Sequence, residues 1–379
     1  MKKPHLLIIS DTPMWHHEAK VHVFEATLRE VEMLTNEFEN ITWLGASNPG
    51  KPNANARPES TGNITCITLP LLGGGGIWNK LKQVLCLPWF FVRVLLLILK
   101  YKYVHTRAPS VPAGMAILIS KYDKRRHYWH KFAGNWVQKH PPKSYLLQKK
   151  LMIAAKNTKI AINGYWPNSP PHVLSFENPC FSEDELAIAL QVAEIKKYNS
   201  QLELLFVGRM EWPKGPGRII DAINLLPETV KQKINVLRLV GKGMDDQAIR
   251  KKAKSLTIPF EITGPLGRKG LNQLYSSSHI FLLPSSASEG FPKVLAEAAA
   301  YGCIPVTSDV SAIGQYVKDG ENGILLQSLE PNTIAKRLGE LILDTKELRV
   351  IAKKATEIAK LYTYERYNER IATEVFQLR

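Results

Sequence analysis

The segment GRMEWPKG, which starts at Gly208, places two cations where they could bind phosphate. It follows an apolar, strand-like run at 202–207 and precedes a predicted helix. Arg209 and Lys214 would project from this strand–helix loop, where a guanidinium can grip two phosphate oxygens and an ammonium adds a point charge. Gly208 and Gly215 would let the backbone approach a ligand closely. The segment predicts a phosphate-binding loop, and the alternative is an ordinary loop with exposed cations.

A second segment, SEGFPKVLAE at Ser288–Glu297, follows another strand-like run, IFLLP. We expect Pro292 at the first helical position, where its missing N–H costs nothing. The backbone N–H groups near Gly290–Lys293 would then face a ligand in front of the helix, which forms an anion site. Glu289 and Glu297 flank this site, and carboxylates beside phosphate are expected to contact hydroxyl groups instead. The pattern indicates a ligand with phosphates and hydroxyls, such as a sugar nucleotide, unless both glutamates are merely solvated.

Strand-like and helix-like segments alternate along the chain, and this alternation must position both loops. Alternation predicts parallel sheets with right-handed crossovers, and the second half repeats the pattern of the first. The chain has 379 residues, which fits about two domains. We therefore predict an α/β protein with two doubly wound domains. The predicted strands are LLIIS, ITWLG, NITCITL, YVHT, KIAIN, LELLFVG, INVLRLVG, FEITG, IFLLP and IPVTS.

Composition excludes several classes of protein. Apolar residues make up 45% of the chain and charged residues 22%, so the chain is neither disordered nor fibrous. The four cysteines are far apart without a CxxC pair, so we expect neither a disulfide framework nor a zinc site. The apolar run at Leu6–Ile9 is too short for the core of a signal peptide. We expect a cytoplasmic protein.

The net charge of +16 is concentrated in one stretch. Residues 1–79 carry a net charge of −2, residues 80–159 carry +16 and residues 160–379 carry +2. Such asymmetry points to a polyanionic surface, either nucleic acid or an anionic membrane. Inside the basic stretch lies VLCLPWFFVRVLLLIL at Val84–Leu99, too short to span a bilayer, which takes about 20 residues. Trp and Phe with basic flanks favour an interfacial helix at a membrane, and the alternative is a core helix.

The two motifs together closely resemble glycosyltransferase family 4, in the pattern G-R-x4-K-G followed by E-G-F-P-x-V-L-x-E. The likeness continues through VGKGMDDQAIRKKAKSL and FEITGPLGRKGLNQLYSSSHIFLLP to ENGILL, and so covers residues 208–326. The resemblance implies the GT-B fold, in which two Rossmann-like domains face a central cleft. It implies an acceptor-binding domain at 1–180, a nucleotide-sugar-binding domain at 181–360 and a terminal helix at 361–379 that returns to the first domain.

The resemblance also implies roles for individual residues. Arg209 and Lys214 would hold the donor diphosphate and stabilise it as a leaving group. Glu289 would contact the hydroxyls of the transferred sugar, and Glu297 those of the ribose. The positions carried over as donor-binding are Gly208, Arg209, Lys214, Leu266, Glu289, Gly290, Phe291, Pro292, Lys293, Val294 and Glu297, with Leu266 near the base. Such enzymes retain anomeric configuration and need no metal ion, and we expect neither metal nor cofactor here.

The first half matches the family only in outline. The family commonly has a Gly-Gly pair after the first strand, whereas this chain has DTPMWHHEAK at Asp11–Lys20. His16, His17 and Glu18 could line an acceptor pocket there, or lie in a solvated loop. The family also places a histidine near the transferred sugar in the middle of the first domain. We assign it to His130 in RRHYWHKFAGNW, with a structural histidine as the alternative.

These observations predict a retaining, metal-independent hexosyltransferase that uses a nucleotide-sugar donor. UDP is the commonest donor nucleotide in the family. Its acceptor would be a glycan or lipid-linked molecule at the inner face of the cell membrane, in surface-polysaccharide biosynthesis, with residues 80–159 on the anionic surface. A first alternative is a sugar-nucleotide epimerase or hydrolase of the same fold. A distant alternative is a basic protein that binds nucleic acid or membrane without catalysis; no nucleic-acid-binding motif is present, so we expect no nucleic-acid partner.

Overall fold

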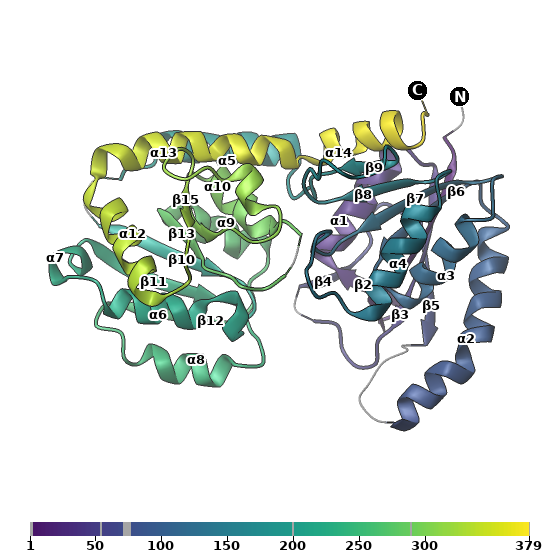
Figure 1. The fold of residues 1–379 in the computed structure, drawn as a ribbon, viewed down its shortest axis with the longest axis horizontal. Helices are drawn as coiled ribbons and strands as arrows, with labels where there is room; N and C mark the ends of the chain where they lie inside the picture. The colour runs from purple at the N-terminus through teal and green to yellow at the C-terminus, as the bar shows by residue number, and fades with distance from the viewer. Residues whose placement is uncertain (1–2, 54, 71–76, 199–200, 289, 379) are drawn as a thin grey trace. The chain divides into compact units, whose positions relative to one another are not determined.

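The computed structural model describes residues 3–53, 55–70, 77–198, 201–288 and 290–378, with side chains of the helix that starts at Ile77 described from residue 85 onward. The chain divides into two compact units (Figure 1). The N-terminal unit comprises residues 1–177 and 365–379, and the C-terminal unit comprises residues 178–364. The sequence placed these boundaries after residues 180 and 360.

The N-terminal unit is built on a nine-stranded sheet. Seven strands run parallel in the order β5-β3-β1-β6-β7-β8-β9, and an antiparallel extension, β2-β4, continues from β1. The order on either side of β1 and β6 runs in opposite directions, so these strands form a topological switch point. The strands are β1 (His5–His17), β2 (Lys20–Phe24), β3 (Asn40–Ser47), β4 (Ala56–Pro58), β5 (Ile64–Pro70), β6 (Tyr103–Ala108), β7 (His127–Phe132), β8 (Lys159–Ile162) and β9 (Val173–Ser175).

Helices cover both faces of this sheet. Side chains alternate between the faces of a strand, and β1 shows this directly. Leu6 and Ile8 pack into one apolar cluster with α1 and the C-terminal segment, whereas Leu7 and Ile9 pack into another with α2 and α3. The helices are α1 (Glu25–Met33), η1 (Leu34–Asn36), α2 (Ile77–Ile98), α3 (Val111–Ser120), α4 (Lys143–Ala154), α14 (Tyr364–Arg370) and the π-helical η4 (Ile371–Val375).

The segment after the first predicted strand has a different structure from the one expected from the sequence. Residues 11–17 continue β1 instead of forming a loop, and residues 20–24 form a second strand, β2, that the sequence analysis did not predict. Pairing of β1 with β3 shifts between Ile9 and Pro13, where β1 carries two more residues than β3. Parallel pairing with β3 resumes after this bulge at Pro13 and Met14, and the end of β1 also pairs with β2 as a hairpin.

The C-terminal unit contains a six-stranded parallel sheet in the order β12-β11-β10-β13-β14-β15. Its strands are β10 (Leu202–Val207), β11 (Ile234–Val240), β12 (Phe260–Thr263), β13 (Ile280–Leu283), β14 (Ile304–Ser308) and β15 (Ile324–Leu326). The order reverses between β10 and β13, which pair directly. A second switch point therefore lies at the carboxyl ends of β10 and β13.

One apolar core holds the C-terminal unit together, with fully buried strand residues such as Leu204, Phe206 and Phe281 at its centre. Nine α-helices described in this unit surround the sheet, with short 3₁₀ turns between some of them. They are α5 (Glu183–Ile195), α6 (Pro216–Asn224), α7 (Glu228–Lys231), α8 (Asp246–Ala253), α9 (Arg268–Ser277), α10 (Lys293–Ala300), α11 (Ile313–Tyr316), α12 (Pro331–Leu343) and α13 (Thr345–Ala359). The 3₁₀ turns are η2 (Trp212–Lys214) and η3 (Lys360–Tyr362). The predicted α/β fold class with two doubly wound units is confirmed.

The apolar helix α2 lies on the N-terminal unit. Phe90, Val94 and Ile98 recur at helical spacing and are buried against the sheet. In the part of the chain that the structure describes, no helix combines the length and the apolar character needed to cross a membrane.

Candidate functional site

The loop after β10 carries the first motif, and its backbone depends on glycine. Gly215 has a φ of 94°, and a Cβ atom built there would lie 2.3 Å from the carbonyl oxygen of Pro284. The close approach allows the loop after β10 to lie against the loop after β13. Arg209 projects with 64% of its side chain exposed and makes a 3.0 Å ion pair with Glu211. Lys214, by contrast, is only 8% exposed.

Hydrogen bonds join these two loops at the switch point. The Arg218 guanidinium donates to the carbonyl of Pro284 at 3.2 Å and to the hydroxyl of Ser286 at 3.2 Å. The backbone N–H of Ser286 donates to the carbonyl of Pro213 at 2.7 Å. The sequence analysis assigned no role to Arg218. The Pro284 carbonyl and the Ser286 hydroxyl lie in a loop distant in sequence, so only the fold reveals that Arg218 links the two loops.

The second motif follows β13. Glu289 lies outside the described residues, so its predicted contact with the sugar stays a prediction. Gly290 and Phe291 are buried. The ring of Phe291 packs on Tyr362 with centroids 4.8 Å apart and meets Tyr316 edge-on at 5.0 Å. Because its side chain faces the core, Phe291 can offer a ligand only its backbone.

Helix α10 starts one residue later than predicted. Lys293 is its first residue, and Pro292 is the N-cap with extended backbone, which corrects the placement of Pro292 at the first helical position. A proline there still wastes no N–H donor. The first turn, which contains Val294, holds no acidic residue. No carboxylate in this first turn compensates the positive end of the helix dipole. The start of α10 can therefore attract an anion.

Glu297 lies one turn into α10 and is held by neighbours. The Tyr275 hydroxyl donates to a Glu297 carboxylate oxygen at 3.1 Å, and Arg268 approaches the other oxygen at 3.8 Å. Arg268 also makes two hydrogen bonds with Glu185, at 3.0 and 3.1 Å. Burial, together with the nearby Glu297 charge, raises the pKa of Tyr275 well above its usual value, so its hydroxyl stays a donor. The sequence motif predicted a binding role for Glu297, but it gave no sign that Tyr275 and Arg268 orient its carboxylate.

Two further loops complete this edge of the sheet. Leu266 lies between β12 and α9, half-buried against the core. Asp245 follows β11, and its carboxylate accepts a 3.0 Å hydrogen bond from the backbone N–H of Trp212 in the first motif. Those predicted donor-binding positions that the structure describes therefore lie in loops after β10, β12 and β13 or in the first turns of α10.

His130 belongs to the other unit. It lies within β7, completely buried. One ring nitrogen bonds the Thr106 hydroxyl at 2.8 Å and the other bonds the Ser120 hydroxyl at 3.0 Å. Burial, with a smaller contribution from His172, lowers its pKa to about 3. This is the environment of the structural histidine that the sequence analysis named as the alternative, since both ring nitrogens already have protein partners.

Comparison with known proteins finds a sequence match to a protein family in the C-terminal unit. Residues 189–358 match the family model for glycosyl transferases group 1. A phosphatidyl-myo-inositol mannosyltransferase from Mycobacterium tuberculosis is 31% identical over 153 residues, which are 40% of this chain and 39% of that protein. The chain matches less than half the length of its curated relatives.

Solved structures extend the comparison to the whole fold. Sucrose-phosphate synthase from Thermosynechococcus elongatus is 18% identical, with a TM-score of 0.72 over 100% of this chain and 99% of that one. Anabaena HepE, solved in complex with UDP-glucose, is 16% identical with a TM-score of 0.63, over 99% of this chain and all of that one. The chain thus has the GT-B fold of these enzymes, and its C-terminal unit carries the sequence pattern of glycosyl transferases group 1.

Proposed function

We propose that this protein is a retaining, metal-independent hexosyltransferase that uses a nucleotide-sugar donor. The observation that carries the proposal is the position of the two motifs. They follow β10 and β13, the two strands of the switch point, and hydrogen bonds from Arg218 and Ser286 join their loops. Open parallel sheets bind ligands outside the carboxyl ends of strands at such a point.

The charges of these loops suit departure of a nucleoside diphosphate. When the sugar bond breaks, negative charge grows on the distal phosphate. Arg209 and Lys214 supply two cations from the loop after β10, and the start of α10 supplies backbone dipoles. Groups fixed before the reaction stabilise the developing charge more than they stabilise the bound donor. In this proposal they act where other transferases use a divalent metal ion.

Carboxylates would recognise the hydroxyl groups of the donor. Glu297, oriented by Tyr275 and Arg268, would accept hydrogen bonds from the ribose, and Glu289 would do so from the transferred sugar. The donor base is proposed to be uracil, because HepE shares the fold and was solved with UDP-glucose.

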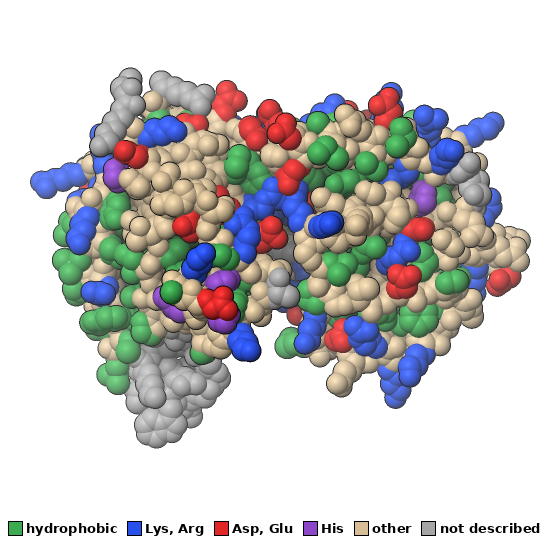
Figure 2. Space-filling model, turned by 180° about the vertical axis from the view of Figure 1, so that it is seen from behind, with side chains coloured by type: hydrophobic (Ala, Val, Ile, Leu, Met, Phe, Trp, Pro, Cys, Tyr) green, Lys and Arg blue, Asp and Glu red, His purple; other side chains and the backbone are tan. Residues whose placement is uncertain are grey.

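We further propose that the acceptor is presented on an anionic membrane, as a lipid-linked glycan of surface-polysaccharide assembly or a related lipid. The outer face of α2 supports this, since Leu85, Trp89, Val92 and Leu96 are each about half or more exposed. Figure 2 shows hydrophobic and basic side chains interspersed on the molecular surface. Exposed apolar residues next to cations suit insertion at a charged lipid interface. The mycobacterial relative is itself named for a lipid acceptor.

Donor use is tested by release of nucleoside diphosphate from UDP-, GDP- and ADP-sugars in EDTA, with and without a membrane-lipid extract. We expect release from one donor, stimulated by lipid. Arg209→Ala and Lys214→Ala should each lower turnover by about 10²-fold or more, the usual loss for a group that stabilises transition-state charge. Lys251→Ala, which removes an exposed cation of α8, is the control and should retain activity. Turnover that needs no acceptor and yields an altered free sugar would favour the epimerase or hydrolase.

Membrane binding is tested separately by sedimentation with vesicles of phosphatidylglycerol and phosphatidylcholine, and of phosphatidylcholine alone. We expect binding to anionic vesicles that weakens as salt is raised. A Trp89→Ser, Leu96→Ser variant should bind several-fold more weakly. Ile195→Ser, which removes an exposed apolar side chain of the C-terminal unit, is the control. Equal binding of all variants, or no binding at low salt, would contradict the membrane proposal and leave the donor proposal intact.

A further inference from the structure

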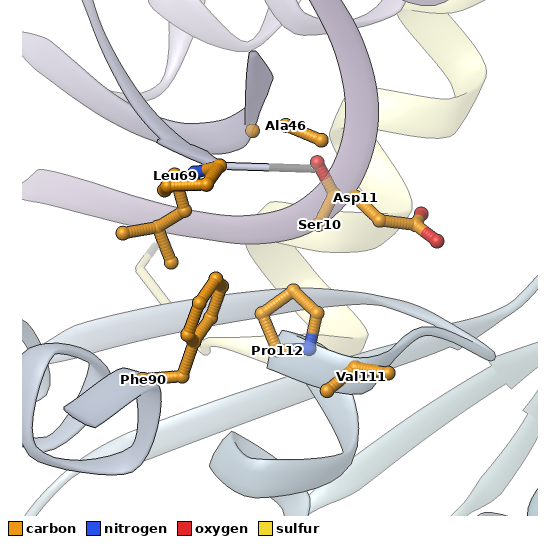
Figure 3. A pocket seen from close by; sticks show the side chains of 9 residues that line it. Ser10, Asp11, Ala46, Leu69, Phe90, Val111 and Pro112 are labelled. Atoms are coloured by element: carbon orange, nitrogen blue, oxygen red, sulfur yellow. The ribbon is translucent and has the colours of Figure 1, made fainter. Parts of the chain in front are cut away.

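The N-terminal unit has a cavity at its own switch point (Figure 3). Its walls come from the bulge of β1, from the carboxyl ends of β3 and β5, from α2 and from the first turn of α3, which follows β6. Because the strand order reverses between β1 and β6, this is the place where a doubly wound sheet binds a ligand. None of the predicted site residues lies in its lining.

The bulge of β1 builds one side of this cavity. Ser10 and Asp11 belong to the three residues of β1, 10–12, that lie opposite the single residue Gly45 of β3. Gly45 on β3 makes room for the bulge, since a Cβ there would lie 2.8 Å from the carbonyl oxygen of Thr12 and 2.6 Å from the Met14 methyl group. Bulges commonly redirect a side chain beside a functional site. Here the bulge places Asp11 at the edge of the cavity.

Most side chains that line the cavity are apolar. They include Leu69, Phe90 and Pro112, and the hydroxyl of Ser10 is already fully hydrogen-bonded. The Ser10 hydroxyl donates to the carbonyl of Leu44 and accepts from the indole N–H of Trp43 and from the backbone N–H of Thr12. One donor and two acceptor positions are all that a hydroxyl has, so it is saturated.

Asp11 supplies the polar contact at the rim. Figure 3 shows its carboxylate pointing away from Leu69 and Phe90, on the side of Val111. Burial raises the pKa of the Asp11 carboxyl, opposed in part by a backbone hydrogen bond, and a carboxylate in that setting gains from a hydroxyl donor. The cavity measures about 60 Å³, well below the roughly 150 Å³ that admits a benzene ring. It therefore has room for a group of one or two carbon atoms, and a sugar ring would stay outside.

We propose that this cavity is an acceptor subsite for a 6-deoxy sugar, whose methyl group lies between Leu69, Phe90 and Pro112 while a ring hydroxyl donates to Asp11. This inference rests on the proposed glycosyltransferase function and names the acceptor class. A hexose would bring a hydroxymethyl group into the same space. Its hydroxyl would lie against Leu69, Phe90 and Pro112, and a hydroxyl that loses its hydrogen bonds to water on burial weakens binding by about tenfold or more.

The probes are methyl glycosides in three matched pairs: L-fucose with L-galactose, L-rhamnose with L-mannose, and 6-deoxy-D-glucose with D-glucose. Binding to the full chain is measured by saturation-transfer NMR and titration. We expect one deoxy glycoside at least to bind, about tenfold more tightly than its partner. Absence of binding by all three deoxy glycosides, or equal affinity within every pair that binds, overturns the proposal.

Two pairs of variants locate the site. Val111→Phe fills the cavity mouth and should weaken binding at least tenfold, whereas Leu118→Phe, on the same helix and similarly exposed, should not. Asp11→Asn should weaken binding several-fold, whereas Glu39→Gln, next to the opposite, amino-terminal end of β3, should not. Thermal unfolding confirms that each variant is folded. Equal effects within both pairs overturn the assignment.

Failure of this inference is distinguishable from failure of the proposed function. Arg209→Ala, which should lose donor turnover, should bind the probes like the unmodified chain because all lining residues belong to the N-terminal unit. Turnover of a donor without any preference for deoxy glycosides overturns the subsite alone. A deoxy preference without donor turnover supports the subsite and contradicts the transferase.

Discussion

Arg209 and Lys214 received the same role from the sequence, yet they differ in their surroundings. Lys214 is buried, and Arg209 is exposed and paired with Glu211. A carboxylate next to a phosphate-binding cation competes with the ligand for that cation and repels it. Residue spacing cannot reveal this competition, because Glu211 is two positions from Arg209 and its direction depends on the loop.

The first prediction concerns this pair. Glu211→Gln should tighten binding of UDP by about two- to fivefold, because an exposed ion pair contributes about 0.2–1 kcal/mol and must be broken for Arg209 to bind phosphate. Isothermal titration measures the affinity. Glu261→Gln removes a carboxylate from another exposed ion pair in the same unit and should have no effect. Weaker UDP binding by Glu211→Gln would show that Glu211 orients Arg209 instead of competing for it.

The second prediction follows from His130 and concerns stability against pH. The folded-state pKa of about 3 lies below the ordinary value of 6.5, so the unfolded chain binds the proton more readily. Stability is therefore complete above about pH 6.5 and falls as the pH drops toward 3. At pH 5 the loss from this group is about 2 kcal/mol.

Urea unfolding at pH 7.5 and pH 5 measures this loss, and a His130→Gln variant should show a smaller difference between the two. His105 also contributes to the total, since burial lowers its pKa well below the usual value. The exposed His140 provides the control, because His140→Gln should leave the difference unchanged. An unchanged difference in His130→Gln would contradict the buried, neutral state.

At the level of elements, hydrophobic pattern predicted the apolar parallel strands well, because buried parallel strands are continuous apolar runs. The hydrophobic pattern did not predict strands that carry polar side chains. The strand β7, HYWHKF, buries two polar side chains, His130 and Lys131, whose hydrogen-bonding and ionic partners are distant in sequence. The end of β1 and the strand β2 were missed for a related reason: their pairing is local and antiparallel, and their turn contains no glycine.

The third prediction concerns that turn. Glu18 and Ala19 have φ of 49° and 60°, so both central residues of the hairpin lie in the left-handed region. Such turns favour Asn-Gly. Ala19→Gly should therefore stabilise the protein, by about 0.5–1 kcal/mol, measured by urea unfolding. Lys20→Gly, one residue later within β2, should instead lower stability, since glycine in a strand costs conformational entropy. Destabilisation by both substitutions would show that the turn geometry differs in solution.

At the scale of the whole molecule, the chain leaves the N-terminal unit after Glu177 and comes back to it at Glu365. The resemblance implied a returning terminal helix, but not what holds it. Tyr367 packs against Phe176 and Trp129, and Phe376 packs against Phe38, as part of one apolar cluster. In Figure 1 α14 lies beside β8 and β9. This contact joins residues from both ends of the chain, so no local sequence pattern predicts it.

A buried charge cluster completes this contact and carries the last prediction. Glu30 on α1 is 1% exposed and accepts hydrogen bonds from Arg107 at 2.8 Å, Lys131 at 2.5 Å and Tyr367 at 3.3 Å. Glu30→Gln would leave the buried Lys131 and the partly buried Arg107 without their anion, and breaking a buried ion pair typically costs about 3–5 kcal/mol. The matched control is Glu374→Gln, which breaks a more exposed ion pair with Arg370 and should cost no more than about 1 kcal/mol.

The expected result is selective loss of the N-terminal unit. Calorimetry of Glu30→Gln should show one unfolding transition moved to lower temperature, while UDP, whose proposed site lies in residues 208–297, still shifts the other transition upward. Removal of residues 365–379 should lower the same transition further, because it exposes the apolar cluster as well as the charges. If the UDP-sensitive transition fell by the same amount in Glu30→Gln, the two units would unfold as one, and the C-terminal segment would stabilise the whole chain instead of the unit that it joins.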